Sequence, residues 1–349
     1  MEFGIYHEFV SQPGRPDSQA FADAFGIVDA AEQYGLDVMW LAELHFDPAR
    51  SVLSSPMLIA AAIAGRTERM KIGTSVQVLP LSNPLRIAEE GATLDHICQG
   101  RLIFGVGRSG VAKTYEAYNI SYAESKDRFN EALEIIERAW KEPTFSHTGR
   151  FYQFDDVSVV PRPFQQPTPE IRVAAQSPDT FPTLGEQGRP MFLSVRHENA
   201  NMFLSYIDIY QKAWAAAGHP GRGKVYLRAA GFVGPTDAEA HERYKPTLMH
   251  HYRSQANLLE DSARRLNTPA DSPRWKTVER LRTISYEEAI KGTVLVGSPD
   301  TVTTRLKALA DELGLDGIQF EFNGGGKVQA AHEKEALRLL CQEVKPAFG

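Results

Sequence analysis

The chain has 349 residues, of which 42% are hydrophobic and 23% charged, as in ordinary globular enzymes. Its formal net charge of -6 is mildly acidic and argues against nucleic-acid binding. No apolar run approaches the ~20 residues of a membrane helix, and the first residues lack the basic and then apolar pattern of a signal peptide. We therefore expect no membrane or nucleic-acid partner. Cys98 and Cys341 lie far apart, and we expect free thiols, which fits a reducing cytoplasm.

Eight apolar segments predict strands, and helical patterns separate them. In the helical pattern after Glu124, apolar residues recur at spacings of four, three and four, which defines one helix face (Phe129, Leu133, Ile136 and Trp140). The predicted strands are Phe3–Tyr6, Val38–Ala42, Met70–Leu79, Leu102–Val106, Ile171–Ala175, Met191–Ser194, Val225–Val233 and Gly317–Phe322.

Four helices are expected to begin where a capping side chain precedes a proline. These pairs are Ser55-Pro56, Asn83-Pro84, Ser177-Pro178 and Ser298-Pro299. Proline at the first helical position loses an N–H that would have no partner there, and the residue before it can accept from the helix backbone.

Strand, short polar loop and capped helix, repeated, are typical of right-handed βαβ units and a parallel sheet. An open doubly wound sheet would show the same local pattern. We favour the closed α/β barrel, a (β/α)8 TIM barrel, because eight units leave no strand over. The sequence thus predicts one domain over residues 1–349, with insertions after strands 4 and 7.

Two regions interrupt the alternation. Residues 143–169 are rich in proline and aromatic residues, and we expect a small hairpin there. Residues 236–292 are long, charged and mostly helical in pattern. An insertion of this size on the strand-to-helix side often forms a lid or substrate wall; an extra packing layer or a dimer surface is the alternative.

Glu43 and His45 follow the second predicted strand. The carboxyl ends of barrel strands share one face, and active sites lie there. Since the two residues are two positions apart, they can point to the same side. A carboxylate–imidazole pair can orient a ligand or move protons, so both are candidate catalytic residues. In the third predicted strand, Gly73 indicates a bulge or a close approach of other atoms.

The segment 105–110 (Gly-Val-Gly-Arg-Ser-Gly) formally matches a dinucleotide-binding fingerprint. That motif also requires an acid at the end of the next strand, and Asp127, which has the spacing, begins a helix instead. We expect these glycines to let the backbone approach a flat ring or a phosphate. Arg108 then offers a planar donor fork to an anion; a glycine-rich turn with a surface arginine is the alternative.

Gln176 and Ser177 stand between a predicted strand end and a helix N-terminus. Such a terminus presents free N–H groups and suits a phosphate, which Ser177 can also bind. Ser177 as a helix cap alone is the other interpretation.

Taken together, these segments resemble the bacterial luciferase-like flavin monooxygenases over most of the chain. Single motifs are weak evidence, but six occur in order. The six segments are 1–4 (Met-Glu-Phe-Gly), 35–46, 72–80, 100–108, 190–194 and 296–302.

The resemblance implies a (β/α)8 barrel that binds flavin at its carboxyl face. It implies a non-proline cis peptide bond between Ser75 and Val76, which with Gln77 faces the flavin ring. It assigns the flavin phosphate to Arg108, Gln176 and Ser177. Gly107 and Ser194, at strand ends, complete the expected cofactor contacts.

Three positions depart from the luciferases themselves. Leu44 replaces a histidine implicated in light emission, and because leucine cannot transfer a proton, we carry over no catalytic base at that position. Gly107 stands in place of the reactive cysteine. Gln176 replaces a glutamate, which removes a negative charge near the expected phosphate.

The resemblance implies a cytoplasmic, FMN-dependent monooxygenase that acts as a homodimer on a small organic substrate. Molecular oxygen and a separate NAD(P)H:flavin reductase, which delivers reduced FMN, would be its partners. Glu43 and His45 would line the site. Two alternatives remain: deazaflavin-dependent hydride transfer, and a non-catalytic flavin-binding subunit.

Overall fold

The computed structural model describes residues 1–12, 14–175, 178–194 and 200–349. Eight parallel strands close into a barrel because the last of them, β12, pairs with β1. This confirms the predicted (β/α)8 fold. In order around the barrel they are β1 (Glu2–His7), β2 (Val38–Leu41), β3 (Lys71–Thr74), β5 (Leu102–Gly107), β8 (Glu170–Ala175), β9 (Met191–Ser194), β10 (Val225–Val233) and β12 (Gly317–Glu321).

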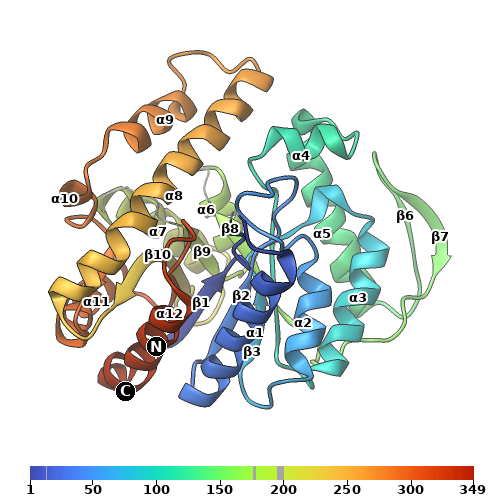
Figure 1. Ribbon diagram of the computed structural model, residues 1–349. Helices are drawn as coiled ribbons and strands as arrows, with labels where there is room; N and C mark the ends of the chain where they lie inside the picture. The colour runs from blue at the N-terminus through green and yellow to red at the C-terminus, as the bar shows by residue number, and fades with distance from the viewer. Residues whose placement is uncertain (13, 176–177, 195–199) are drawn as a thin grey trace.

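Each barrel strand is followed by a helix, and these helices surround the barrel (Figure 1). They are α1 (Asp17–Tyr34), α2 (Pro56–Ala64), α3 (Pro84–Ile97), α5 (Ser125–Lys141), α6 (Thr180–Glu186), α7 (Ala200–Ala216), α11 (Pro299–Leu313) and α12 (Ala330–Leu339). Among the described residues, none of the helices is long and apolar enough to cross a bilayer. Both cysteines are buried free thiols.

The prediction of one continuous strand over Met70–Leu79 was wrong. This segment consists of β3 and a short β4 (Gln77–Val78), which pairs with β5 further along. A non-proline cis peptide bond joins Ser75 and Val76 between the two pieces, as the family resemblance predicted. The strand β11 (Leu295–Gly297), which the sequence did not predict, pairs with the end of β10.

Two of the predicted helix caps are confirmed. The side chain of Asn83 accepts from Leu85 N at 2.9 Å, and that of Ser298 accepts from Thr301 N at 3.4 Å. Ser55 precedes α2 but makes no capping hydrogen bond, so this prediction was wrong; Pro56 alone marks that start. Ser177 lies outside the described residues.

Trp40 fills the interior of the barrel. A Cβ added to Gly4 would lie 2.5 Å from Trp40 Nε1, and one added to Gly73 would lie 2.3 Å from Trp40 Cε3. These glycines stand on the two strands beside β2, and the absence of their side chains leaves room for the indole. Across the barrel the indole stacks on Phe192, with ring centroids 5.4 Å apart. The close approach predicted at Gly73 is therefore that of an indole ring.

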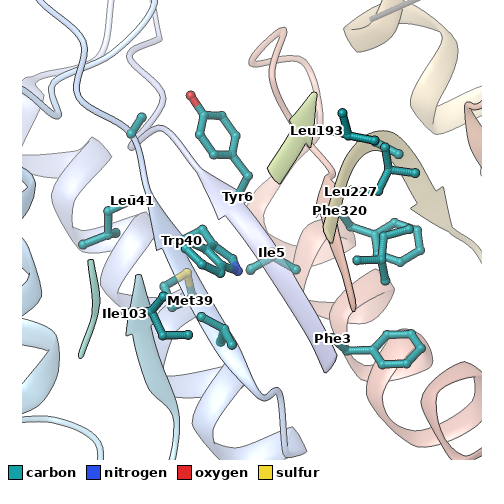
Figure 2. Packing of buried hydrophobic residues seen from close by; sticks show 14 of the residues in the cluster. Phe3, Ile5, Tyr6, Met39, Trp40, Leu41, Ile103, Leu193, Leu227 and Phe320 are labelled. Carbon is teal, nitrogen blue, oxygen red and sulfur yellow. The ribbon is translucent and has the colours of Figure 1, made fainter. Parts of the chain in front are cut away.

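The second layer of core lies between the strands and the helices. Phe3, Met39 and Leu41 are fully buried there (Figure 2). The predicted face of α5 is buried along its whole length and ends at Trp140, whose Nε1 donates to Ala88 O at 2.9 Å. Helix α5 thus joins the barrel to α3.

Two excursions leave the barrel. The expected hairpin within 143–169 is the antiparallel pair β6 (Phe145–Thr148) and β7 (Gln153–Val157), which comes after α5 rather than directly after the fourth strand. The helical region after β10 contains α8 (Asp237–Arg265), α9 (Pro273–Thr283) and α10 (Tyr286–Ala289). In Figure 1, α8 and α9 lie above the strands, at the same end as α4 (Ala112–Ala117).

Helix α8 is held firmly on the loop that follows β12. Tyr244 of α8 donates to Glu321 O at 3.0 Å. A Cβ on Gly325 would lie 2.0 Å from Thr247 O of α8, so the glycines of this loop allow the backbones to meet. The segment is therefore a fixed wall over the carboxyl end of the barrel.

We predict that Gly105→Ala destabilises the protein by about 1–3 kcal/mol or more, as overpacking does. Its Cβ would lie 1.8 Å from Thr74 O, which is backbone and cannot turn away. Gly110→Ala is the matched control, because a Cβ there meets nothing within 4 Å. Urea unfolding of both variants measures the difference, and equal stabilities would contradict the packing argument.

Candidate active site

The predicted pair Glu43 and His45 is brought together. His45 Nε2 lies 2.9 Å from Glu43 Oε1, and the two side chains are 9% and 4% exposed. The second oxygen of Glu43 accepts from Val78 N at 2.8 Å. Glu43 therefore ties the end of β2 to β4, immediately after the cis peptide bond, while His45 Nδ1 lies 3.4 Å from the exposed Tyr118 hydroxyl.

Arg108, at the end of β5, has a guanidinium group that pairs with none of the residues that the structure describes. Its carbonyl accepts from the hydroxyl of Tyr115, which fixes the backbone of this turn. Burial raises the pKa of Tyr115, so that hydroxyl keeps its proton. Arg108 is half-buried, and its charge remains available to an anion.

The neighbouring strand gives a further reason for the glycines of this segment. A Cβ on Gly107 would lie 2.6 Å from Val76 Cγ2, which is a close contact but less severe than the 1.8 Å clash at Gly105. The glycines thus let β5 approach the segment that contains the cis peptide bond. The expected contact of Gly107 with a flavin stays a prediction.

Ser75 faces Gln319 across the barrel, with Ser75 Oγ 3.4 Å from Gln319 Oε1. Among the described residues, the acceptor Gln77 Oε1, two positions after Ser75, and the donor Gln319 Nε2 are buried without a hydrogen-bond partner. Ser194 lies opposite Arg228 in the β9–β10 register, and Arg228 lies opposite Gln319. The predicted residues Ser75 and Ser194 therefore flank a polar row. Gln176 and Ser177 lie outside the described residues.

The sequence did not predict a buried cluster of charges at the carboxyl end of the barrel. We call it the barrel-end cluster: Tyr6, Glu8, Arg50, Arg228, His251 and Glu321. Arg50 Nε donates to Glu8 Oε2 at 2.9 Å, and Arg228 Nη2 donates to Glu321 Oε2 at 2.8 Å. The same Arg228 atom lies 4.0 Å from Glu8 Oε1, so the two ion pairs are connected.

Aromatic and imidazole rings complete this cluster. The Arg228 guanidinium lies 3.4 Å from the ring centroid of Tyr6, a cation–π contact. His251 Nδ1, from α8, lies 3.8 Å from Glu321 Oε1. Burial raises the pKa of Tyr6, so its hydroxyl stays neutral.

The electrostatics keep Glu321 ionised. Burial alone would raise the pKa of this carboxyl, but Arg228, His251 and Arg50 outweigh burial and lower the pKa to about 2. The pKa of Arg228 is raised because Glu321, Tyr6 and Glu8 outweigh its own burial. Both partners are therefore charged at any ordinary pH.

A signal for this cluster was present in the sequence. Arg228 stands inside the apolar strand 225–233, and Gln319 and Glu321 alternate with apolar residues in 317–322. Polar residues at every second position of a barrel strand point to one side. Arg50 and His251 gave no such signal, since they come from a loop and from the helical insertion.

A closed parallel barrel with polar and ionisable side chains at its carboxyl end is typical of TIM-barrel enzymes. The chain is a member of the luciferase-like monooxygenase family, whose profile matches residues 1–317. It is accordingly an oxidoreductase.

The individual relatives differ in the cofactor that their names give. The chain is 24% identical over 347 residues to the oxygenase component of a flavin-dependent trigonelline monooxygenase from Acinetobacter baylyi, covering 99% of this chain and 94% of that one. It is 36% identical over 165 residues to an F420-dependent glucose-6-phosphate dehydrogenase from Kineococcus radiotolerans, covering 45% and 48%. The oxygenating constituent of 3,6-diketocamphane monooxygenase from Pseudomonas putida, solved with FMN, superposes with a TM-score of 0.80 at 23% identity, covering 99% and 98%.

We predict that Glu321→Gln destabilises the protein most at neutral pH and progressively less in acid. The pKa of Glu321 is about 2 in the folded chain against an ordinary value of 4.5, so its stabilisation is complete above pH 4.5 and is lost as the pH falls toward 2. The shift corresponds to on the order of 3 kcal/mol.

Urea unfolding of the wild type and the variant between pH 7 and pH 3 measures this difference. The control is Glu335→Gln, which breaks the more exposed pair with Arg243; such pairs contribute about 0–1 kcal/mol. A stability gap for Glu321→Gln that stays constant across this pH range would contradict the assignment.

Proposed function

We propose that this chain is the oxygenase of a two-component monooxygenase and that it uses reduced FMN and oxygen on a small organic substrate. The observation that carries the proposal is a set of unpaired polar groups: two, on Gln77 and Arg108, stand where the family resemblance expects flavin, and a third, on Gln319, belongs to the residue that contacts Ser75. Among the described residues, Gln77 Oε1 and Gln319 Nε2 are buried without a partner, and the guanidinium of Arg108 has none.

These groups suit the two ends of FMN. The pyrimidine edge of the ring carries one N–H donor and two carbonyl acceptors, which an amide oxygen and an amide N–H can bind. The phosphate is a dianion, and a guanidinium fork binds such a group with two parallel hydrogen bonds. Gly107 and Ser194 would lie along the ring, with Gln176 and Ser177 beside the phosphate.

When bound, reduced FMN supplies the two electrons with which one oxygen atom enters the substrate and the other becomes water. The protein positions the ring and excludes bulk water. Glu43 holds Val78 N and so fixes the segment that faces the ring. His45, hydrogen-bonded to Glu43, is placed to hold or release a proton at Nε2.

A separate flavin reductase is the expected partner. The trigonelline enzyme is itself named as an oxygenase component, and it aligns with nearly the whole of this chain. The second candidate function is F420-dependent hydride transfer, which the partial similarity to the F420-dependent dehydrogenase favours. Reduced FMN and reduced F420 are therefore both used as test cofactors.

We predict that the protein binds reduced FMN and slows its reaction with oxygen. The complex is mixed rapidly with oxygenated buffer, and flavin absorbance is followed with time. We expect oxidation of bound flavin to be slower than that of free reduced FMN, because the ring is shielded from water.

Oxidation at the rate of free reduced FMN, together with tight binding of F420, would replace the monooxygenase proposal by hydride transfer. Tight binding of FMN with no effect on its oxidation would support a non-catalytic subunit. Binding of neither cofactor would refute the flavin site altogether.

We predict that replacing Glu43 and His45 together by glutamine changes the oxidation rate of bound reduced FMN at least about tenfold, as expected when a proton-transferring group is lost. The same variant should bind FMN within a few-fold of the wild type, because its amides retain hydrogen-bonding capacity. His96→Gln, in the last turn of α3, is the control. An unchanged rate and pH profile would remove this pair from the proposed mechanism.

A further inference from the structure

Arg228 uses only part of its guanidinium group within the protein. Nη2 donates a hydrogen bond to Glu321, whereas Nε is buried and has no hydrogen-bond partner among the described residues. No described residue accepts from Nη1, and the side chain remains 18% exposed although it stands inside the barrel. One charged donor therefore faces solvent at the carboxyl end of the barrel.

This donor lies next to the expected flavin positions. Arg228 is paired in register with Ser194 on one side and with Gln319 on the other. Gln319 in turn touches Ser75. A group bound to Arg228 would therefore lie against the flavin cradle, where the substrate of the reaction must be.

Apart from His251, which is charged only when protonated, the charges around Arg228 already balance. Glu8 neutralises Arg50, and Glu321 neutralises Arg228. A carboxylate on Arg228 would bring a third negative charge into a largely buried cluster that holds two arginines. Burying an unbalanced charge is costly, whereas a neutral oxygen accepts from the guanidinium without changing the balance.

We propose that Arg228 binds a neutral oxygen of the substrate, a carbonyl oxygen, and thereby determines which substrates this chain accepts. This inference rests on the proposed function for the nature of the reaction, and deepens it by naming the group that the site recognises. Arg228 holds the oxygen through Nη1, and a substrate carboxylate is disfavoured.

The surroundings make Arg228 a rigid donor. Its guanidinium is fixed on one side by the Tyr6 ring and on the other by Glu321. Glu321 is itself held by Tyr244, which binds its carbonyl oxygen, and a Cβ on Gly324 would lie 2.2 Å from its Oε1. Because the donor is already ordered, little conformational entropy is lost when an acceptor binds.

The test compares cyclohexanone with its hydrocarbon isostere methylenecyclohexane and with a charged probe built on the same six-membered ring, cyclohexanecarboxylate. Their affinities are measured by ligand-observed NMR, with and without FMN, and the FMN affinity is measured separately by quenching of flavin fluorescence. We expect the wild type to prefer cyclohexanone over both other probes.

The main variant is the double substitution Arg228→Met with Glu321→Gln, which removes the ion pair without leaving one charge buried and unpaired. It should bind cyclohexanone about tenfold more weakly, the loss expected for one hydrogen bond to a charged group, and FMN within twofold of the wild type. Arg222→Met is the matched control: this arginine pairs with Asp316 before β10 begins, and its side chain is 55% exposed.

Three results would overturn the inference: equal affinity for the ketone and its hydrocarbon isostere, preference for the carboxylate, or parallel losses of FMN and ketone binding in the double variant. The inference and the proposed function fail separately. If FMN does not bind but the ketone binds in an Arg228-dependent way, the flavin proposal fails and this one stands. If FMN binds and the ketone preference is absent, only this inference fails.

Discussion

The position of one indole ring determines what the rest of the barrel can do. Trp40 occupies the interior at the level of Gly4 and Gly73 and stacks on Phe192. Arg172 lies over the same indole and over Tyr226, and it is neutralised by Glu2 and Glu170. The amino-terminal half of the barrel is thereby filled. Polar side chains of the same strands can meet a ligand only above this layer, at the carboxyl end.

Burial then decides which polar side chains the upper layer can hold. Each ionised group there needs a partner, because an isolated charge would be neutralised or would destabilise the fold. The barrel-end cluster meets this requirement with two arginines and two glutamates from β10, β12 and the segments after β1 and β2. Compared with well-packed apolar side chains, such a cluster adds little net stability, since desolvation offsets much of the Coulomb attraction. We therefore attribute the importance of the cluster to the ordered donor that it leaves at Arg228.

The sequence was sufficient for the barrel and insufficient for this cluster. Apolar runs and capping residues reflect local physics, so the eight strands and the buried face of α5 could be predicted from nearby residues alone. The break between β3 and β4 could not be derived from periodicity, and only the resemblance located the cis peptide bond at Ser75-Val76. Glu43 and His45 are neighbours in sequence, which made their contact predictable. Glu8 and Arg50 are 42 positions apart, and their pairing depends on how two loops fold back.

The helical insertion contacts both the barrel-end cluster and the loop that follows β12. Helix α8 brings His251 to Glu321, and it packs on the glycine loop after β12 through Thr247. The glycines of that loop and the hydrogen bond from Tyr244 fix the insertion closely to the strand ends, so that it forms a rigid wall over the carboxyl end of the barrel. Family members that share the barrel but differ in this segment would therefore present different groups to the same central strands. In this chain, the wall holds Glu321, Glu321 holds Arg228, and the chemistry of the site depends on where that guanidinium points.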